Sequence, residues 1–340
     1  MDRIRRTLVA GLAATPALSL FPGAWAADPL KLSHQFPGGD GTEGDFRDKL
    51  SRQFASEVAK RSNGALKLNV YPGSSLMKVN AQFSSVRKGA LDMTLIPLPY
   101  AGGEVPELNI ALMPGLVTSY EQGYAWKKQP IGKALTDLLA DKGVILVTWI
   151  WQAGGAASRA SPVIGPEDVK GLKFRGGSRE MDLVAKAAGA TTLSLPSSET
   201  YAAMQTGAVD IVTTSATSLI SFRLQEVSKH LTINKQGKSY WFMLEPLLMS
   251  KIIFDKLPKD QQALIMTVGG EMEKIALDGA RADDAAVADQ YRKAGATVHE
   301  LTDAALAKWV ALARTSAWKD YAEKNDNSAR LLKLAEQVTA

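Results

Sequence analysis

Residues 201–211 of the chain, YAAMQTGAVDI, combine a helix end, a glycine and the start of a strand, and residues 83–93, FSSVRKGALDM, repeat this combination. In each copy the glycine occupies the place of a left-handed helix C-cap, and an aspartate, Asp92 or Asp210, opens the strand that follows. We interpret the copies as one helix-to-strand step that occurs in each of two lobes of similar construction. A chance likeness between two helix–strand units is the alternative.

Strand and helix patterns alternate around both copies. A short apolar strand is expected over residues 30–34, and apolar residues at every fourth position of residues 46–58 predict the buried face of a helix. In the second half, Lys173 to Arg175 is expected as a strand that is followed by further helix and strand patterns. This order predicts an α/β protein with parallel sheets covered by helices.

Three longer segments complete the expected fold. Residues 144–151, VILVTWIW, are predicted as one continuous buried strand or a crossover between lobes, and residues 240–249 as another strand. A long helix is expected from Pro258 to residue 294, and Gly269 with its neighbouring glycine is expected to kink it. The tail predicts two further amphipathic helices.

Length and composition limit the class of protein. The chain has 340 residues, a formal net charge of +5, 46% hydrophobic residues, three histidines and no cysteine. One hydrophobic core seldom serves so long a chain, so two domains are expected. The cysteine count excludes a disulfide scaffold and a Cys-ligated zinc site, and the charge is too small to predict a nucleic-acid partner. The histidines lie far apart in the sequence, so neither a metal nor another cofactor is predicted.

Residues 1–26 read as an export signal. They have a basic start, an apolar run over residues 8–21 and an A-x-A cleavage motif at residues 24–26. Arg5 and Arg6 also fit a twin-arginine signal, so the export route stays open between the two types. The sequence therefore predicts a periplasmic protein.

Arg175 is the principal candidate for ligand binding. It ends the predicted strand that begins at Lys173 and is followed by Gly176 and Gly177. Ligands of open α/β sheets bind at the carboxyl ends of strands, and a guanidinium pairs with a carboxylate through two parallel hydrogen bonds. The alternative is a surface arginine in a polar loop.

Hydroxyl and aromatic groups at other predicted strand ends extend this site. Residues 213–218, TTSATS, follow a predicted central strand, and either Thr217 or Ser218 is expected to cap the next helix, leaving Thr213 and Thr214 to face the ligand. The full set of predicted ligand-binding residues is Arg175, Thr213, Thr214, Gln152, Trp151, Gln35, Pro97, Tyr100, Trp241 and Gly176.

One catalytic motif competes with a binding function. Ser75 and Lys78 match S-x-x-K, which suggests a secreted serine hydrolase, but the chain has neither of the S-D-N and K-T-G partner motifs. Residues 38–43, GGDGTE, faintly resemble a calcium loop, and a turn is the better interpretation because the pattern lacks its terminal acid and does not repeat. The prediction is therefore a binding protein and not an enzyme.

Residues 166–175, PEDVKGLKFR, residues 199–210, ETYAAMQTGAVD, and residues 226–232, EVSKHLT, together with the export signal, resemble the solute-binding subunits of tripartite ATP-independent periplasmic (TRAP) transporters of the DctP type. The resemblance spans nearly the whole mature chain. It implies a two-lobed, type II-like periplasmic binding protein whose lobes are hinged around a ligand cleft and braced by a long helix. It also implies that Arg175 forms a salt bridge to the ligand carboxylate and that TRAP permease subunits in the inner membrane are the partners.

The chain departs from this family at two positions. The family's asparagine near the carboxylate falls on Thr214, and a second ligand arginine seen in many members falls near Gly155. With one basic anchor, a dicarboxylate or sialic acid is not expected. The Trp and Tyr content favours a monocarboxylate with an apolar or aromatic body, such as an aromatic or branched 2-oxo or 2-hydroxy acid. A binding protein for an ATP-driven importer or a sensor kinase is the remaining alternative.

The predicted domains follow from these patterns. Lobe I is expected to contain residues 27–150 and about 240–270, and lobe II residues 151–239 and about 271–340 with the bracing C-terminal helices.

Overall fold

The computed structural model describes residues 28–39, 44–234 and 239–339. The predicted export signal and most of the candidate calcium loop lie outside these residues. Within the described part of the chain, no helix has both the length and the hydrophobicity that a bilayer span requires.

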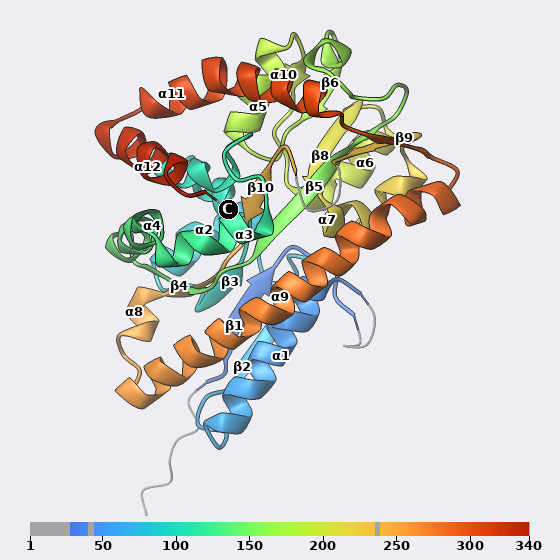
Figure 1. The fold of residues 1–340 in the computed structure, drawn as a ribbon. Helices are drawn as coiled ribbons and strands as arrows, with labels where there is room; N and C mark the ends of the chain where they lie inside the picture. Colours follow the sequence, from blue (N-terminus) through green and yellow to red (C-terminus); the bar gives the residue numbers. More distant parts are fainter. Residues whose placement is uncertain (1–27, 40–43, 235–238, 340) are drawn as a thin grey trace, which may run out of the picture.

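Lobe I is built on a five-stranded sheet with the order β2-β1-β3-β11-β4 (Figure 1). Strand β1 pairs in parallel with β2 and β3, whereas β11 pairs antiparallel with β3 and β4. The strands are β1 (Leu30–His34), β2 (Leu68–Tyr71), β3 (Met93–Leu95), β4 (Val144–Thr148) and β11 (Leu247–Ser250).

Lobe II is built on a second sheet with the order β12-β9-β5-β8-β6-β7, and β10 pairs with β5 beside this path. Its strands are β5 (Trp151–Ser158), β6 (Lys173–Arg175), β7 (Thr191–Thr192), β8 (Ile211–Ser215), β9 (His230–Ile233), β10 (Phe242–Leu244) and β12 (Thr297–Glu300). Both sheets are mixed and not purely parallel as predicted, because β5 and β11 run antiparallel to their neighbours.

The two longest predicted strands are each divided between the lobes. Residues 144–151 contain all of β4 in lobe I and the first residue of β5 in lobe II, and residues 240–249 contain β10 in lobe II and most of β11 in lobe I. Pro246 has no backbone N–H for a ladder, which interrupts the second run. The backbone N–H of Glu245 donates to the carbonyl of Ile150 at 2.8 Å, so the two crossing segments lie side by side and form the hinge.

The helices cover both sheets. They are α1 (Phe46–Arg61), α2 (Val79–Arg87), α3 (Tyr120–Ala125), α4 (Pro130–Asp141), α5 (Arg179–Ala187), α6 (Thr200–Gln205), α7 (Ala216–Ser221), α8 (Lys251–Phe254), α9 (Lys259–Lys293), α10 (Asp303–Ala313), α11 (Lys319–Ala322) and α12 (Asp326–Glu336). The C-terminal helices arch from lobe II, where α10 meets α5, to lobe I, where α12 meets α4 (Figure 1).

Helix α9 is the predicted bracing helix. Its 35 residues pack against α1 and β4 of lobe I and against α7 and β5 of lobe II (Figure 1). The helix continues without a break through Gly269 and Gly270, so these glycines do not interrupt it, and the expected kink stays a prediction. Gly269 instead permits close packing, because a Cβ there would lie 2.6 Å from the carbonyl oxygen of Val147.

The repeated sequence unit has the same backbone geometry in both lobes. Gly89 and Gly207 have φ angles of +71° and +74°, which confirms the left-handed caps. The Asp92 carboxylate accepts the backbone N–H of Lys31 at 2.7 Å, and the Asp210 carboxylate accepts that of Lys173 at 2.9 Å. In each lobe the aspartate thus binds the first residues of the neighbouring parallel strand, which supports a similar construction of the lobes.

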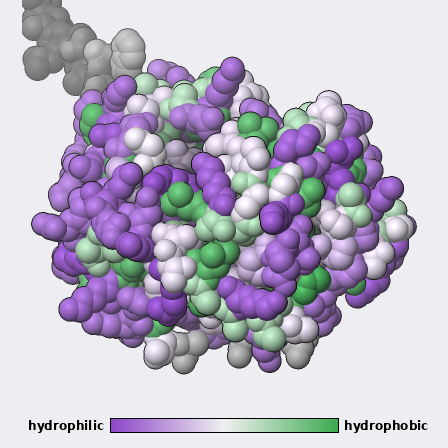
Figure 2. Space-filling model, turned by 90° about the horizontal axis from the view of Figure 1, so that it is seen from above, coloured by the Kyte–Doolittle hydropathy of each residue, from purple (hydrophilic) through white to green (hydrophobic). Residues whose placement is uncertain are grey.

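Three groups of buried apolar residues stabilise this arrangement. One lies between α1, α9 and the lobe I sheet, one between α6, α7, α9 and the lobe II sheet, and the largest joins both lobes to the C-terminal helices. On the face seen in Figure 2 hydrophilic residues dominate, and hydrophobic residues form small groups among them. The exact lobe boundaries given above stay a prediction.

Candidate functional site

Arg175 ends β6 and is 2% exposed. Its Nε donates to the Leu195 carbonyl at 2.9 Å and its Nη1 to the Thr213 carbonyl at 2.9 Å. Its Nη2 donates to the Tyr100 hydroxyl at 2.9 Å and to the Ser197 hydroxyl at 3.3 Å. All of these acceptors are neutral, and within the described residues no carboxylate lies within 4.0 Å of the guanidinium. Arg175 is therefore a buried cation that lacks an anionic partner in the described chain.

Tyr100 brings lobe I to this cation. It lies in the 3-10 helix η1 (Leu98–Ala101), which follows β3, and Pro97 caps that helix. Besides accepting from Arg175, its hydroxyl accepts the backbone N–H of Ser197 at 2.9 Å. The predicted residues Tyr100 and Arg175 are thus brought together at the seam between the lobes, whereas Pro97 lies at the start of η1.

The two glycines after Arg175, Gly176 and Gly177, have different structural roles. Gly177 has a φ of +84°, and a Cβ there would lie 3.0 Å from Nη1 of Arg175, so a side chain would crowd the guanidinium. Gly176 donates its N–H to the Asp182 carboxylate at 2.9 Å, and its carbonyl accepts from the Thr213 hydroxyl at 2.8 Å. Burial raises the pKa of Asp182 to about 6, and the nearby Arg175 acts in the opposite direction.

A second buried arginine, Arg47 of α1, was not predicted. Its Nε and Nη2 donate to the Asp45 carboxylate at 2.9 Å and 2.6 Å. Its Nη1 donates to Glu245 at 2.8 Å and contacts the Ser215 hydroxyl at 3.5 Å, and Nη2 also donates to the Ser218 hydroxyl at 3.0 Å. All five N–H groups of a guanidinium are thereby used, so Arg47 keeps no donor for a ligand, in contrast to Arg175.

Glu245, which was also not predicted as a site residue from the sequence, connects Arg47 to Gln152. It lies fully buried in the hinge, and its Oε2 accepts from Arg47 and from the Gln152 side-chain amide. Burial raises the pKa of the Glu245 carboxyl, and the charges of Arg47 and Arg175 act against that rise. A lone acidic residue inside the apolar run of residues 240–249 was the available sequence signal.

Several buried polar atoms near the carboxyl ends of the strands have no hydrogen-bond partner among the described residues. They are the side-chain oxygen and nitrogen of Gln35, Oε1 of Gln152, Oε1 of Glu245 and the Thr214 hydroxyl. Buried polar groups are usually satisfied, so such atoms call for a ligand or water. Gln35, Gln152 and Thr214 belong to the predicted set.

The two predicted tryptophans pack in the core. Trp151 stacks edge-on against Trp126 with ring centroids 5.1 Å apart, and Trp241 lies against Gly154.

The predicted caps of α7, Thr217 or Ser218, were wrong: Ser215 is the N-cap, and its hydroxyl accepts the backbone N–H of Ser218. The strand continues further than expected, which moves the cap two to three residues earlier.

The residues of the competing hydrolase hypothesis lie apart from this seam. Ser75 and Lys78 are exposed in the turn before α2. No hydrogen bond joins their side chains within the described residues, and no group of three or more metal-ligating side chains is assembled there or elsewhere in those residues. Within the described residues, the two side chains of the S-x-x-K motif are therefore not assembled with each other into a catalytic pair.

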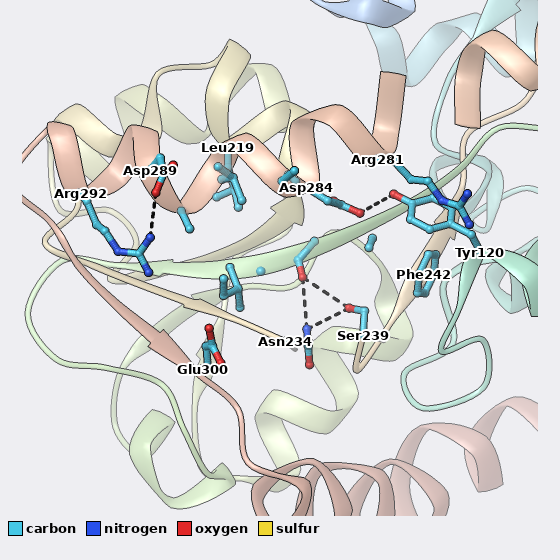
Figure 3. A pocket seen from close by; sticks show the side chains of 18 of the residues that line it. Tyr120, Leu219, Asn234, Ser239, Phe242, Arg281, Asp284, Asp289, Arg292 and Glu300 are labelled. Carbon is cyan, nitrogen blue, oxygen red and sulfur yellow. Dashed lines mark hydrogen bonds and ion pairs between the residues drawn. The ribbon is translucent and has the colours of Figure 1, made fainter. Parts of the chain in front are cut away.

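Two cavities lie close to the lobe seam. A cavity of about 530 Å³ opens beside Tyr100 and Gly177, between η1 of lobe I and α5 of lobe II. Another of about 460 Å³ lies on the α9 side of β5, with Arg281 and Arg292 at its two ends (Figure 3). There the Tyr120 hydroxyl donates to Asp284, and Arg292 pairs with Asp289 (Figure 3). The first cavity is lined by Tyr100 and Leu195, which both accept hydrogen bonds from Arg175, but Arg175 itself is not among its lining residues.

Comparison with known proteins agrees with this geometry. Residues 42–325 match the family model of DctP, described as bacterial extracellular solute-binding protein, family 7. The chain belongs to this family.

The chain is a TRAP solute-binding protein by its structural relatives as well. The crystal structure of a TRAP periplasmic solute-binding protein from Rhodoferax ferrireducens, with bound malonate, is 65% identical with a TM-score of 0.89, covering 91% of this chain and 98% of that one. A succinate-bound TRAP protein from Sulfurospirillum deleyianum shares the fold at 23% identity and a TM-score of 0.79, covering 92% and 99%. The C4-dicarboxylate-binding periplasmic protein DctP of Rhodobacter capsulatus is 27% identical over 90% of this chain and 91% of its own length. These relatives confirm the predicted family and the two-lobed fold of this solute-binding protein.

Proposed function

We propose that this TRAP solute-binding protein captures a small organic acid anion in the periplasm, pairs its carboxylate with Arg175 and delivers it to the membrane permease subunits. The observation that carries the proposal is the buried Arg175 guanidinium, whose hydrogen-bond acceptors are all neutral. A buried charge is stable only when it is paired, so a ligand carboxylate is the fitting partner.

The charge balance favours a monocarboxylate. Arg47 already serves Asp45 and Glu245 with all its donors, which leaves Arg175 as the one buried guanidinium of the described chain without an acid. The rest of the ligand would meet the free amide and hydroxyl groups of Gln35, Gln152 and Thr214. Trp151 and Trp241 make core contacts, so the aromatic content gives only weak support to an apolar or aromatic ligand body. The malonate in the Rhodoferax ferrireducens relative makes a short diacid the main competing ligand class.

Closure of the lobes completes the proposed capture. Tyr100 of lobe I contacts Arg175 and Ser197 of lobe II, so the anchor is assembled from both sides of the seam. A ligand that contacts both lobes favours the closed state by its differential affinity. The closed protein would then be the form that the permease receives.

Calorimetric titration tests the anchor. Wild type, Arg175→Ala and Lys229→Ala are titrated with malonate, pyruvate, 3-methyl-2-oxobutanoate and phenylpyruvate. Lys229 is exposed in lobe II, so its removal is a control for loss of one positive charge. Arg175→Ala should lose about 2 to 5 kcal/mol of binding free energy, at least about 30-fold in Kd, whereas the control should bind as wild type does. Equal affinities of wild type and Arg175→Ala for the bound acid would refute the assignment, and a strong preference for malonate would refute the monocarboxylate class.

A further inference from the structure

Helix α1 of lobe I meets the start of α7 of lobe II at a seam that Arg47 crosses. Asp45 and Arg47 lie at the N-terminus of α1, and Ser215 and Ser218 lie at the N-terminus of α7. The side chains of all four residues are buried. The guanidinium also lies over the Phe36 ring, 3.5 Å from its centroid, which fixes its plane. Arg47 is therefore held rigidly in lobe I while two of its contacts belong to lobe II.

The contacts of Arg47 on the two sides of the seam differ in strength. On the lobe I side, Asp45 accepts from Nε and Nη2 in a fork at 2.9 Å and 2.6 Å. On the lobe II side, the acceptors are hydroxyls: Ser218 at 3.0 Å and Ser215 at 3.5 Å. A bidentate carboxylate holds a guanidinium more strongly than a hydroxyl does. When the lobes separate, the hydroxyl contacts are thus the ones that break.

Arg47 also holds the hinge. Glu245 lies between β10 of lobe II and β11 of lobe I, and its carboxylate accepts from Arg47 at 2.8 Å and from Gln152. Its backbone N–H donates to Ile150 in the other crossing segment. One guanidinium thus contacts lobe I, lobe II and the hinge between them.

We propose that Arg47 is an interlobe latch: its charge-assisted hydrogen bond to Ser218 forms as the lobes close and sets the lifetime of the closed state. The latch does not touch the ligand, because every donor of Arg47 is already used. It goes beyond the capture function, since it acts on the lobe equilibrium whether or not a ligand is bound. Ser215 contributes less, because its hydroxyl lies further away and serves as the cap of α7.

Distances between spin labels in the two lobes test the latch. The chain has no cysteine, so Lys60→Cys in α1 and Gln205→Cys in α6 give one labelled pair at exposed positions. In that background we compare Ser218→Ala with Ser221→Ala. Ser218→Ala leaves the α7 cap intact, because the cap uses the backbone N–H of residue 218. Ser221 lies on the same helix with a buried hydroxyl that has no hydrogen-bond partner in the described chain, which makes Ser221→Ala the matched control.

Ser218→Ala should lower the closed-to-open ratio by about tenfold and raise the dissociation rate of malonate, the probe ligand, by a similar factor. Ser221→Ala should match the parent in both. Arg47→Lys should resemble Ser218→Ala, because an ammonium cannot hold Asp45, Glu245 and Ser218 in one plane. Equal ratios for Ser218→Ala and Ser221→Ala would overturn the latch, as would a parent whose label distances show no closed population with or without malonate. This test separates the latch from the proposed function, on which it does not rest. If Arg175 is not the ligand anchor, malonate will not change the label distances as expected, but the ligand-free closed-to-open ratios of Ser218→Ala and Ser221→Ala will still differ.

Discussion

Replacing Glu180 by glutamine should stabilise the protein more at pH 8 than at pH 5. Glu180 lies in the first turn of α5, is fully buried, and has Oε2 without a hydrogen-bond partner in the described chain. Its Oε1 accepts from Arg179 at 3.3 Å. Burial raises the pKa of Glu180 to about 7, and the charge of Arg179 opposes this rise only in part.

The sign follows from proton binding. A raised carboxyl pKa means that the folded protein holds the proton more tightly than the unfolded chain, so stability falls as pH rises from about 4.5 to about 7 and stays low above it. One pKa unit corresponds to about 1.4 kcal/mol, and the shift therefore lowers the free energy of unfolding by roughly 3 kcal/mol at pH 8 and by roughly 1 kcal/mol at pH 5. Glutamine removes this ionisation, so its advantage should be about 2 kcal/mol larger at pH 8 than at pH 5.

Urea unfolding at the two pH values measures this difference. Glu323→Gln is the matched control, because Glu323 is 66% exposed and only loosely paired with Lys319 at 3.9 Å. It should change the free energy of unfolding equally at both pH values. If Glu180→Gln also changes the free energy of unfolding equally at pH 5 and pH 8, the folded protein does not raise the pKa of Glu180, and this prediction is wrong.

Three further changes probe the fold. Gly154→Ala should lower the free energy of unfolding by about 3 kcal/mol, because the new Cβ would overlap the Thr214 carbonyl oxygen and the Trp241 ring. An unchanged urea midpoint would contradict the close pairing of β5 with β8. Asp92→Ala and Asp210→Ala should each lower it by about 1 to 2 kcal/mol, since each removes one equivalent strand contact, and losses that differ by more than about 1 kcal/mol would argue against equivalent units. Burial and the neighbouring His230 lower the pKa of His299, so the stability of the protein should fall as pH drops below about 6.5. His230→Asn should weaken that fall, measured by thermal unfolding between pH 7 and pH 5. An unaltered pH profile would contradict the interaction of His230 with His299.

Local patterns predicted the individual elements well. The strands Leu30–His34 and Lys173–Arg175 have the predicted bounds, because each is a short run between clear turn signals. The run over residues 144–151 is the crossover between lobes that was one of its two predicted forms, whereas the run over residues 240–249 was wrongly predicted as a single strand. Hydrophobicity reports that a segment is buried and does not report in which sheet, so a change of lobe within an apolar run leaves little trace beyond Glu245 and Pro246.

The site was predicted only in part, for a similar reason. The sequence makes Arg175 a candidate because ligands of open α/β sheets bind at the carboxyl ends of strands, and its place there is visible without the structure. Arg47 stands among Asp45, Asp48 and Lys49, a charge run typical of a solvated helix end, and its partner Glu245 lies 198 residues away. Only the assembled seam shows that these charges neutralise each other in the interior. The contacts of Trp151 and Trp241 likewise depend on which face of a strand meets the core.

The pairing of Glu245 with Ile150 limits how the molecule can move. The two crossing segments share a backbone hydrogen bond at the point where both change lobes, so neither can rotate without carrying the other along. We therefore expect the two segments to move together when the lobes open and close. Such coupling of two chain segments would make the path between the open and closed forms more reproducible from one closure to the next.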